Sequence, residues 1–214
     1  MIEYESLIVH PLFSIPVLET KVLNYKNDVI DFNNIPYHLF NKNPLQQNTF
    51  NSISQNILDD PSFKNLRSII DSLMEEYVYN QLKLPRHSKL KLVNSWMAIG
   101  HPGSETNGHT HPNSVYSGIF YLKAGPGTGM VSFSIPRNSF TFTTPTVSPM
   151  PTEFNMYNSL CWNVEPDDNT VLIFPSHLEH SITRNVSNNI RCCVPFNYFL
   201  VEEISTQPTQ FLFL

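Results

Sequence analysis

Seventeen prolines spread over 214 residues restrict this chain to short elements of secondary structure. Proline lacks a backbone donor and breaks helices and central strands, and seven glycines add further turn positions. This punctuation favours short strands joined by loops over long helices. Hydrophobic residues make up 41% of the chain, and a chain of this length can bury a substantial core.

One segment nevertheless keeps a helical period. Asp60 can cap it and Pro61 suits its first turn. Apolar residues then recur on one side of the helix, at Phe63, Leu66, Ile69, Ile70, Leu73, Met74, Tyr77 and Val78. We expect this apolar stripe to pack against a sheet. A second helix is predicted at residues 25–32, and residues 10–18 are predicted to form an edge strand or an extended arm.

The chain becomes rich in β-branched and aromatic residues from residue 89 onwards. Strands are predicted at 89–99, 114–122, 130–135, 169–175, 180–184 and 190–201, with a polar turn at 101–108. Residues 137–158 lack periodicity and are predicted to be an irregular insertion of the kind that forms lids or binding loops. We predict one mainly β domain, a sandwich or barrel. Its parts would be a helical N-terminal support (1–88), a β core (89–202) and a tail (203–214).

Charge and cysteine usage narrow the class of protein. The net charge of -5 and the scattered basic residues argue against a partner such as duplex nucleic acid. Cys161, Cys192 and Cys193 form no C-x-x-C pair, so a disulfide framework is not expected. The sequence shows no signal peptide and no long apolar run, which predicts a soluble, intracellular, cytoplasmic protein without a membrane partner. The abundance of asparagine is typical of an AT-rich genome, for example a viral one, and the aromatic-rich ends allow an oligomer interface.

Two histidines stand two residues apart, at positions 109 and 111. In an extended strand their side chains point to the same face with Cα atoms about 6.6 Å apart, so both imidazoles can converge on one ion. His180 follows an apolar strand and a proline turn. Because facial metal sites can take two ligands locally and one from a distant segment, we predict that His109, His111 and His180 bind a metal ion. The alternative is that the pair at 109 and 111 consists of ordinary surface or turn residues.

Several motifs follow one another in a fixed order between residues 92 and 197. They are Trp96, Gly108-His109-Thr110-His111-Pro112-Asn113-Ser114, Ser117-Gly118-Ile119-Phe120-Tyr121-Leu122, Phe174-Pro175-Ser176, His180, Arg191 and Phe196-Asn197. This ordered set resembles the 2-oxoglutarate- and iron(II)-dependent oxygenases. The resemblance implies a double-stranded β-helix (jelly roll). It also implies iron(II), 2-oxoglutarate and O2 as cofactor and co-substrates, and dioxygenase activity, most simply that of a hydroxylase.

The resemblance assigns the three histidines to the metal and Arg191 to the distal carboxylate of 2-oxoglutarate, with Tyr121 as a second candidate for that carboxylate. Independently, burying an arginine among apolar neighbours is costly without an anion, and its planar guanidinium matches a carboxylate. A structural ion pair with one of the 18 acidic residues is the alternative. The chain departs from the commonest triad, because His111 stands where that triad has an aspartate. Glu105 or Glu179 remain possible sources of a carboxylate ligand.

Two other functions fit parts of the pattern. A cupin-type metalloenzyme would use the histidines without 2-oxoglutarate and would have no need of Arg191. A catalytically silent jelly-roll binding or structural protein would bind no metal at all. The substrate stays open at this stage, among protein side chains, peptides, nucleotides and small metabolites.

Overall fold

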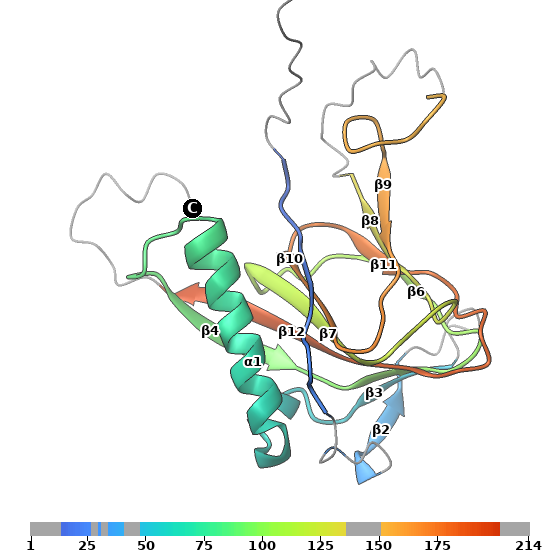
Figure 1. Ribbon diagram of the computed structural model, residues 1–214. Helices are drawn as coiled ribbons and strands as arrows, with labels where there is room; N and C mark the ends of the chain where they lie inside the picture. The colour runs from blue at the N-terminus through green and yellow to red at the C-terminus, as the bar shows by residue number, and fades with distance from the viewer. Residues whose placement is uncertain (1–13, 27–29, 31–33, 41–47, 136–150, 202–214) are drawn as a thin grey trace, which may run out of the picture.

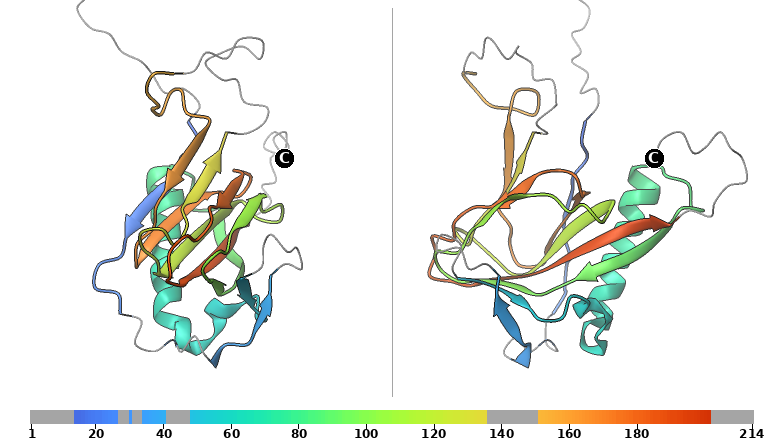
Figure 2. Two further views of the ribbon diagram at one scale, coloured as in Figure 1. Left: turned by 90° about the vertical axis from the view of Figure 1, so that its right-hand side faces the viewer. Right: turned by 180° about the vertical axis from the view of Figure 1, so that it is seen from behind.

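The computed structural model describes residues 14–26, 30, 34–40, 48–135 and 151–201. Two antiparallel sheets form the body, which confirms the mainly β jelly-roll prediction (Figure 1). The larger sheet has the order β1 (Leu18–Lys21), β10 (Thr170–Pro175), β7 (Tyr116–Lys123), β12 (Arg191–Val201), β5 (Ala98–Gly100), β3 (Thr49–Ser52) and β2 (Tyr37–Leu39), and β4 (Lys89–Ser95) also pairs with β12. The smaller sheet has the order β6 (Thr106–His109), β11 (His180–Ile182), β8 (Val131–Ser134) and β9 (Cys161–Val164). Strands β8 and β9 lie side by side at one end of the molecule (Figure 2).

Strand β12 has two differently packed faces because its side chains alternate. Cys193 packs in the inner core between the sheets, whereas Cys192, Val194 and Phe196 pack in the outer core on the other side of the larger sheet. By the same alternation Arg191 shares the inner face with Cys193, as the sequence predicted. The inner face of β12 therefore looks toward the smaller sheet, where two of the three histidines lie.

The predicted capped helix is present. The Asp60 carboxylate accepts from the backbone N–H of Ser62, and a 3-10 turn (Pro61–Phe63) leads into α1 (Lys64–Glu75) and a π-helical end (Glu76–Gln81). Its buried residues belong to the outer core, so the apolar stripe packs against the outer face of the larger sheet: Leu66, Ile70, Met74, Tyr77 and Val78.

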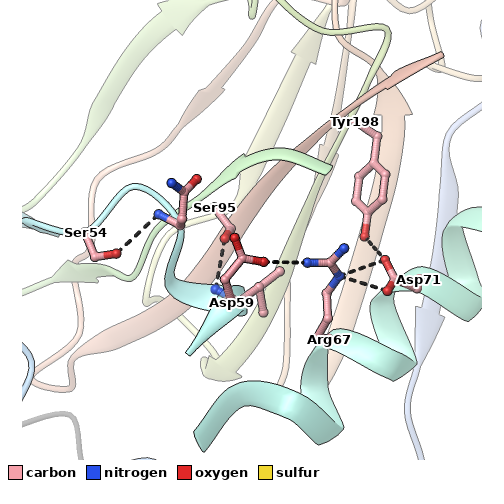
Figure 3. A network of polar contacts seen from close by, with 8 residues as sticks. Ser54, Asp59, Arg67, Asp71, Ser95 and Tyr198 are labelled. Atoms are coloured by element: carbon pink, nitrogen blue, oxygen red, sulfur yellow. Dashed lines mark hydrogen bonds and ion pairs between the residues drawn. The ribbon is translucent and has the colours of Figure 1, made fainter. Parts of the chain in front are cut away.

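A polar network also joins α1 to the larger sheet (Figure 3). Arg67 donates from Nε to Asp71 over 2.8 Å and from Nη1 to Asp59 over 2.9 Å. The Tyr198 hydroxyl on β12 donates to the same Asp71 carboxylate. Burial, followed by the hydrogen bond and charge of Asp71, raises the pKa of Tyr198, which therefore stays protonated as a donor. The network fixes α1 against the half of β12 that carries Tyr198.

Some boundaries differ from the predictions for physical reasons. The predicted strand at 89–99 is divided into β4 and β5, because both lie beside the long β12 and pair with different halves of it. The predicted turn at 101–108 ends in strand β6, since pairing with β11 gives extended backbone to a polar sequence. Strands β2, β3 and β9 were not predicted, because they are short and their pairing partners lie far away in the chain.

The N-terminal part contributes strands as well as a helix, since β1 to β3 all join the larger sheet. The second predicted helix, 25–32, is not helical at residues 25, 26 and 30, and its other residues lie outside the described ones. Residues 10–13, most of the predicted insertion and the tail from 203 also lie outside them. No helix in the described parts of the chain is long and apolar enough to cross a membrane.

Candidate active site

The three predicted histidines meet at the mouth of the sandwich. His109 ends β6 and is the Cα partner of His180 at the start of β11, while His111 lies just beyond β6. One ligand atom from each ring lies within 4.8 Å of the others. The ring centroids are 4.4 Å apart for His109 and His180, 5.1 Å for His111 and His180, and 5.2 Å for His109 and His111. Rings at these separations can share one metal ion, and no carboxylate joins them among the described residues.

Each histidine is held in the same tautomer. The Nδ1 atom lies 2.9 Å from the Asn107 carbonyl in His109 and 2.9 Å from the Leu178 carbonyl in His180. A carbonyl oxygen only accepts, so Nδ1 carries the proton in both rings. In His111, Nδ1 lies 2.5 Å from Oδ1 of Asn197, which is likewise an acceptor. All three Nε2 atoms are therefore left as lone-pair donors, the arrangement found in metal-binding histidines.

Burial keeps two of the rings neutral. It is the largest cause that lowers the pKa of His180 to about 3, and the nearby His109 ring lowers it further. Burial also lowers the pKa of His111. Phe174 packs edge-on against the His180 ring, with centroids 4.7 Å apart. A buried, neutral His180 is ready to bind a metal without first losing a proton.

Arg191 lies in the same pocket and is only 4% exposed. Its Nη1 donates to the Thr128 carbonyl over 2.6 Å, and it forms no ion pair with any residue that the structure describes. The structural ion pair considered as an alternative is therefore absent from the described part of the chain. A buried guanidinium without an acidic partner is a receptor for an anion.

Two glycines make room for this guanidinium. A Cβ atom on Gly100 would lie 2.7 Å from Nη2 of Arg191 and 2.6 Å from Oγ of Ser104. A Cβ on Gly129 would meet Nη1 of Arg191, and its φ of +110° already favours glycine. The missing side chains thus shape the cradle of Arg191. Glycine roles of this kind depend on contacts between strands and were not predicted from the sequence.

A protein-family comparison agrees with this geometry. Residues 94–197 match the family described as "Putative 2OG-Fe(II) oxygenase". This segment is a 2OG-Fe(II) oxygenase domain. A search of curated proteins finds no match for this oxygenase.

Solved structures agree on the fold of the oxygenase. The carbocyclase SnoK from nogalamycin biosynthesis, described as non-heme and alpha ketoglutarate dependent, aligns with a TM-score of 0.60 at 12% identity, over 90% of this chain and 84% of SnoK. HygX from Streptomyces hygroscopicus, solved with nickel and 2-oxoglutarate bound, aligns with a TM-score of 0.57 at 12% identity, over 86% of this chain and 83% of HygX. A 2OG-Fe(II) oxygenase family oxidoreductase from Burkholderia pseudomallei aligns with a TM-score of 0.52 at 10% identity, over 78% of this chain and 73% of that one. At these identities the likeness shows a common fold and no more.

Three buried hydroxyls among the described residues have no hydrogen-bond partner, those of Tyr37, Ser104 and Tyr121. Two of them lie near Arg191: Tyr121, which the sequence suggested, and Ser104, which it did not. Tyr121 lies beside β12 as the Cα partner of Cys193, and Ser104 lies beside the guanidinium. Burial raises the pKa of Tyr121, so its hydroxyl stays a donor. An unpaired buried hydroxyl is costly, which makes both groups candidates to meet a ligand. Ser104 could have been suspected only from its place in the polar turn.

The remaining pocket wall is apolar or neutral. Beside the three histidines and Arg191, the pocket is lined by Phe40, Thr49, Asn51, Trp96, Ala98, Gly100, Thr106, Gly118, Ile119, Phe174, Ile182, Cys193 and Pro195. Glu105 and Glu179, the alternative carboxylates, are absent from both this lining and the histidine cluster. The donor set is therefore three imidazoles, which suits a first-row transition metal such as iron(II).

Proposed function

We propose that this oxygenase holds iron(II) with His109, His111 and His180 and holds the distal carboxylate of 2-oxoglutarate with Arg191, and that it hydroxylates its substrate. One observation carries the assignment: a buried arginine with no acidic partner among the described residues lines the same pocket as three converging histidines. A cupin without 2-oxoglutarate has no use for that arginine. A catalytically silent jelly roll would need neither the buried arginine nor the converging histidines.

The side chains around Arg191 prepare a site for an anion. The guanidinium keeps its orientation through the bond to the Thr128 carbonyl, while Nη2 points toward the space over Gly100. The hydroxyls of Ser104 and Tyr121 are available as further donors to a carboxylate. Bringing an anion to these groups would satisfy a buried charge and unpaired hydroxyls together. That gain favours a dicarboxylate that reaches from the histidines to Arg191.

The rest of the pocket orients reactants and excludes water. Bound iron(II) supplies the oxygen chemistry that amino-acid side chains lack. Phe174 packs against the buried His180 ring, so polar contacts at that ring act in a low dielectric, whereas His109 is more exposed in the same pocket. The Nδ1 hydrogen bonds hold all three rings at fixed angles.

The lining also favours a class of substrate. Arg191 is the only Arg, Lys, Asp or Glu among the described residues that line the pocket, and we assign it to the co-substrate. A cationic group would need a buried carboxylate, which the described lining lacks. We therefore infer that the reacting part of the substrate is uncharged and lies against Trp96, whose ring centroid is 6.1 Å from that of His111. The three free cysteines agree with a reducing, intracellular compartment.

An anaerobic titration of the iron(II)-loaded protein with 2-oxoglutarate tests this function. We expect a visible charge-transfer band in the wild type that weakens in Arg191→Ala and vanishes in His180→Ala. Iron bound without a band would favour the cupin function. No bound iron would favour the silent jelly roll.

A further inference from the structure

Three polar residues form a row across the inner face of the larger sheet, next to His111. Asn197 on β12 is the Cα partner of Asn94 on β4 and of Ser117 on β7. Paired side chains share a face, and this face is otherwise mainly apolar. Ser117 is fully buried and Asn197 is 5% exposed. Because buried polar groups are almost always satisfied, the hydrogen bonds of the row indicate which atom it presents to position 111.

The two asparagine amides and the Ser117 hydroxyl form a directed chain of hydrogen bonds. Nδ2 of Asn197 donates to Oδ1 of Asn94 over 2.7 Å, so the oxygen of the Asn197 amide faces His111. The Ser117 hydroxyl donates to that same oxygen over 2.6 Å. Ser117 in turn lies 2.8 Å from the hydroxyl of Ser176, which receives a bond from Ser114. The nearest atom that the row presents to Nδ1 of His111 is therefore an acceptor, the Asn197 oxygen at 2.5 Å, while the Ser117 hydroxyl lies farther away at 3.2 Å with its proton directed to Asn197.

An acceptor at this point matches an imidazole N–H and repels a carboxylate. Ionised aspartate has only acceptor oxygens, so an aspartate at 111 would face the Asn197 oxygen. It would gain a donor only if the Ser117 hydroxyl gave up its bond to Asn197, or if the amides of Asn197 and Asn94 both turned over. His111 donates from Nδ1 and keeps Nε2 free. Building on the proposed function, we propose that this row selects histidine over carboxylate as the third metal ligand, with Asn197 as its positioning residue.

The sheet geometry places Asn197 for this purpose. The register of β12 against β4 shifts between Asn197 and Tyr198, and such irregularities re-aim side chains near functional sites. Tyr198 belongs to the outer core and bonds Asp71 of α1. The side chains of Asn197 and Tyr198 therefore lie on opposite faces of the sheet. Tyr198→Phe is therefore a matched control that weakens the helix contact without touching the row.

Anaerobic titration with cobalt(II), followed by its visible absorption, tests the proposal without relying on activity. Asn197→Leu should bind cobalt(II) about 10–100-fold more weakly, as expected for loss of an outer partner of a ligating histidine. Asn197→Asp keeps the acceptor and should bind nearly as tightly as the wild type. His111→Asp should bind more weakly than the wild type, although it restores the commonest triad. Tyr198→Phe should lower the melting temperature and leave cobalt(II) affinity unchanged.

A second measurement reads the tautomer directly in the metal-free protein. Ring-nitrogen NMR should show His111 protonated at Nδ1 in the wild type and in Asn197→Asp. In Asn197→Leu it should show a mixture of tautomers, a change that a purely structural role of Asn197 would not produce. Should Asn197→Leu fail to fold, the wild-type tautomer and His111→Asp still decide the question.

The possible failures are distinguishable. The proposal that the row selects histidine would be overturned by either of two results. One is a His111→Asp variant that binds cobalt(II) as tightly as the wild type, and the other is a wild-type His111 that is protonated at Nε2. A wild type that binds cobalt(II) with the expected ranking of variants but shows no response to 2-oxoglutarate would overturn the proposed function and leave the inference standing. A wild type that binds no cobalt(II) would overturn both.

Discussion

The guanidinium of Arg191 donates to the backbone carbonyl of Thr128 over 2.6 Å, and this bond aims a buried cation into the pocket of the three histidines. The bond uses Nη1, so the opposite edge of the fork is left to meet another acceptor. No acidic residue in the described segments neutralises the charge. The resting protein therefore carries the cost of an unpaired buried charge, which an anionic co-substrate would relieve.

Arg191→Met should weaken 2-oxoglutarate binding without lowering the stability of the metal-free protein. Methionine fills similar space without charge, so co-substrate affinity should fall by about 1.5–3 kcal/mol or more, the range for a hydrogen bond to a charged group. The free energy of unfolding of the metal-free protein should not fall, because the unpaired charge disappears with the side chain. Calorimetric titration with 2-oxoglutarate and chemical denaturation measure the two quantities. Unchanged affinity would remove Arg191 from the co-substrate site.

Gly100→Ala should disturb the same site by shape alone. The new Cβ would lie 2.6 Å from Ser104 Oγ and 2.7 Å from Arg191 Nη2, so the guanidinium must move. We expect 2-oxoglutarate affinity to fall about tenfold or more, since misplacing such a group by about 1 Å can cost as much as 100-fold. Metal affinity should remain, because no histidine is among the nearest atoms. Gly125→Ala is the control: no atom lies within 4 Å of its Cβ position, and its binding should equal that of the wild type.

Tyr121→Phe should have opposite effects on the metal-free and the loaded protein. The hydroxyl is buried without a hydrogen-bond partner, so removing it should raise the free energy of unfolding of the metal-free protein by about 1 kcal/mol. If the hydroxyl donates to the co-substrate, 2-oxoglutarate affinity should fall several-fold. Chemical denaturation of the metal-free protein measures the change in the free energy of unfolding. Titration of the metal-loaded protein measures the change in 2-oxoglutarate affinity. A destabilised metal-free variant would mean that the hydroxyl already has a partner.

Cysteine alkylation should distinguish one thiol from the other two. Cys161 is exposed, whereas Cys192 and Cys193 are buried. Burial raises the pKa of Cys193 to about 11 and also raises that of Cys192, so little reactive thiolate exists in either at about pH 8. Brief treatment with iodoacetamide followed by mass spectrometry should find one modified site in the native protein and three after unfolding. Native modification of Cys193 would contradict the packing of the inner face of β12.

The sequence alone determined what depends on local order. The proline spacing predicted short strands, Asp60 and Pro61 predicted where the helix begins, and the alternation in the last strand placed Arg191 opposite Cys192. These features follow from hydrogen bonding and periodicity within a few residues. The histidine spacing also predicted which three imidazoles come together, because the residue types of a candidate metal site are visible in the chain.

Only the tertiary structure decided what depends on strands that meet from afar. The pairing of β6 with β11 brings His180 opposite His109, and it makes a strand from a sequence that predicts a turn. Pairing of β12 with β4 and β7 sets Asn197 beside His111, 86 positions away, although nothing near either residue signals the contact. Local propensity carries no information about such long-range register, which is fixed by burial of whole faces in the assembled sandwich. The residue types of the site were therefore readable in the chain, but their orientation and polarity were set by the fold.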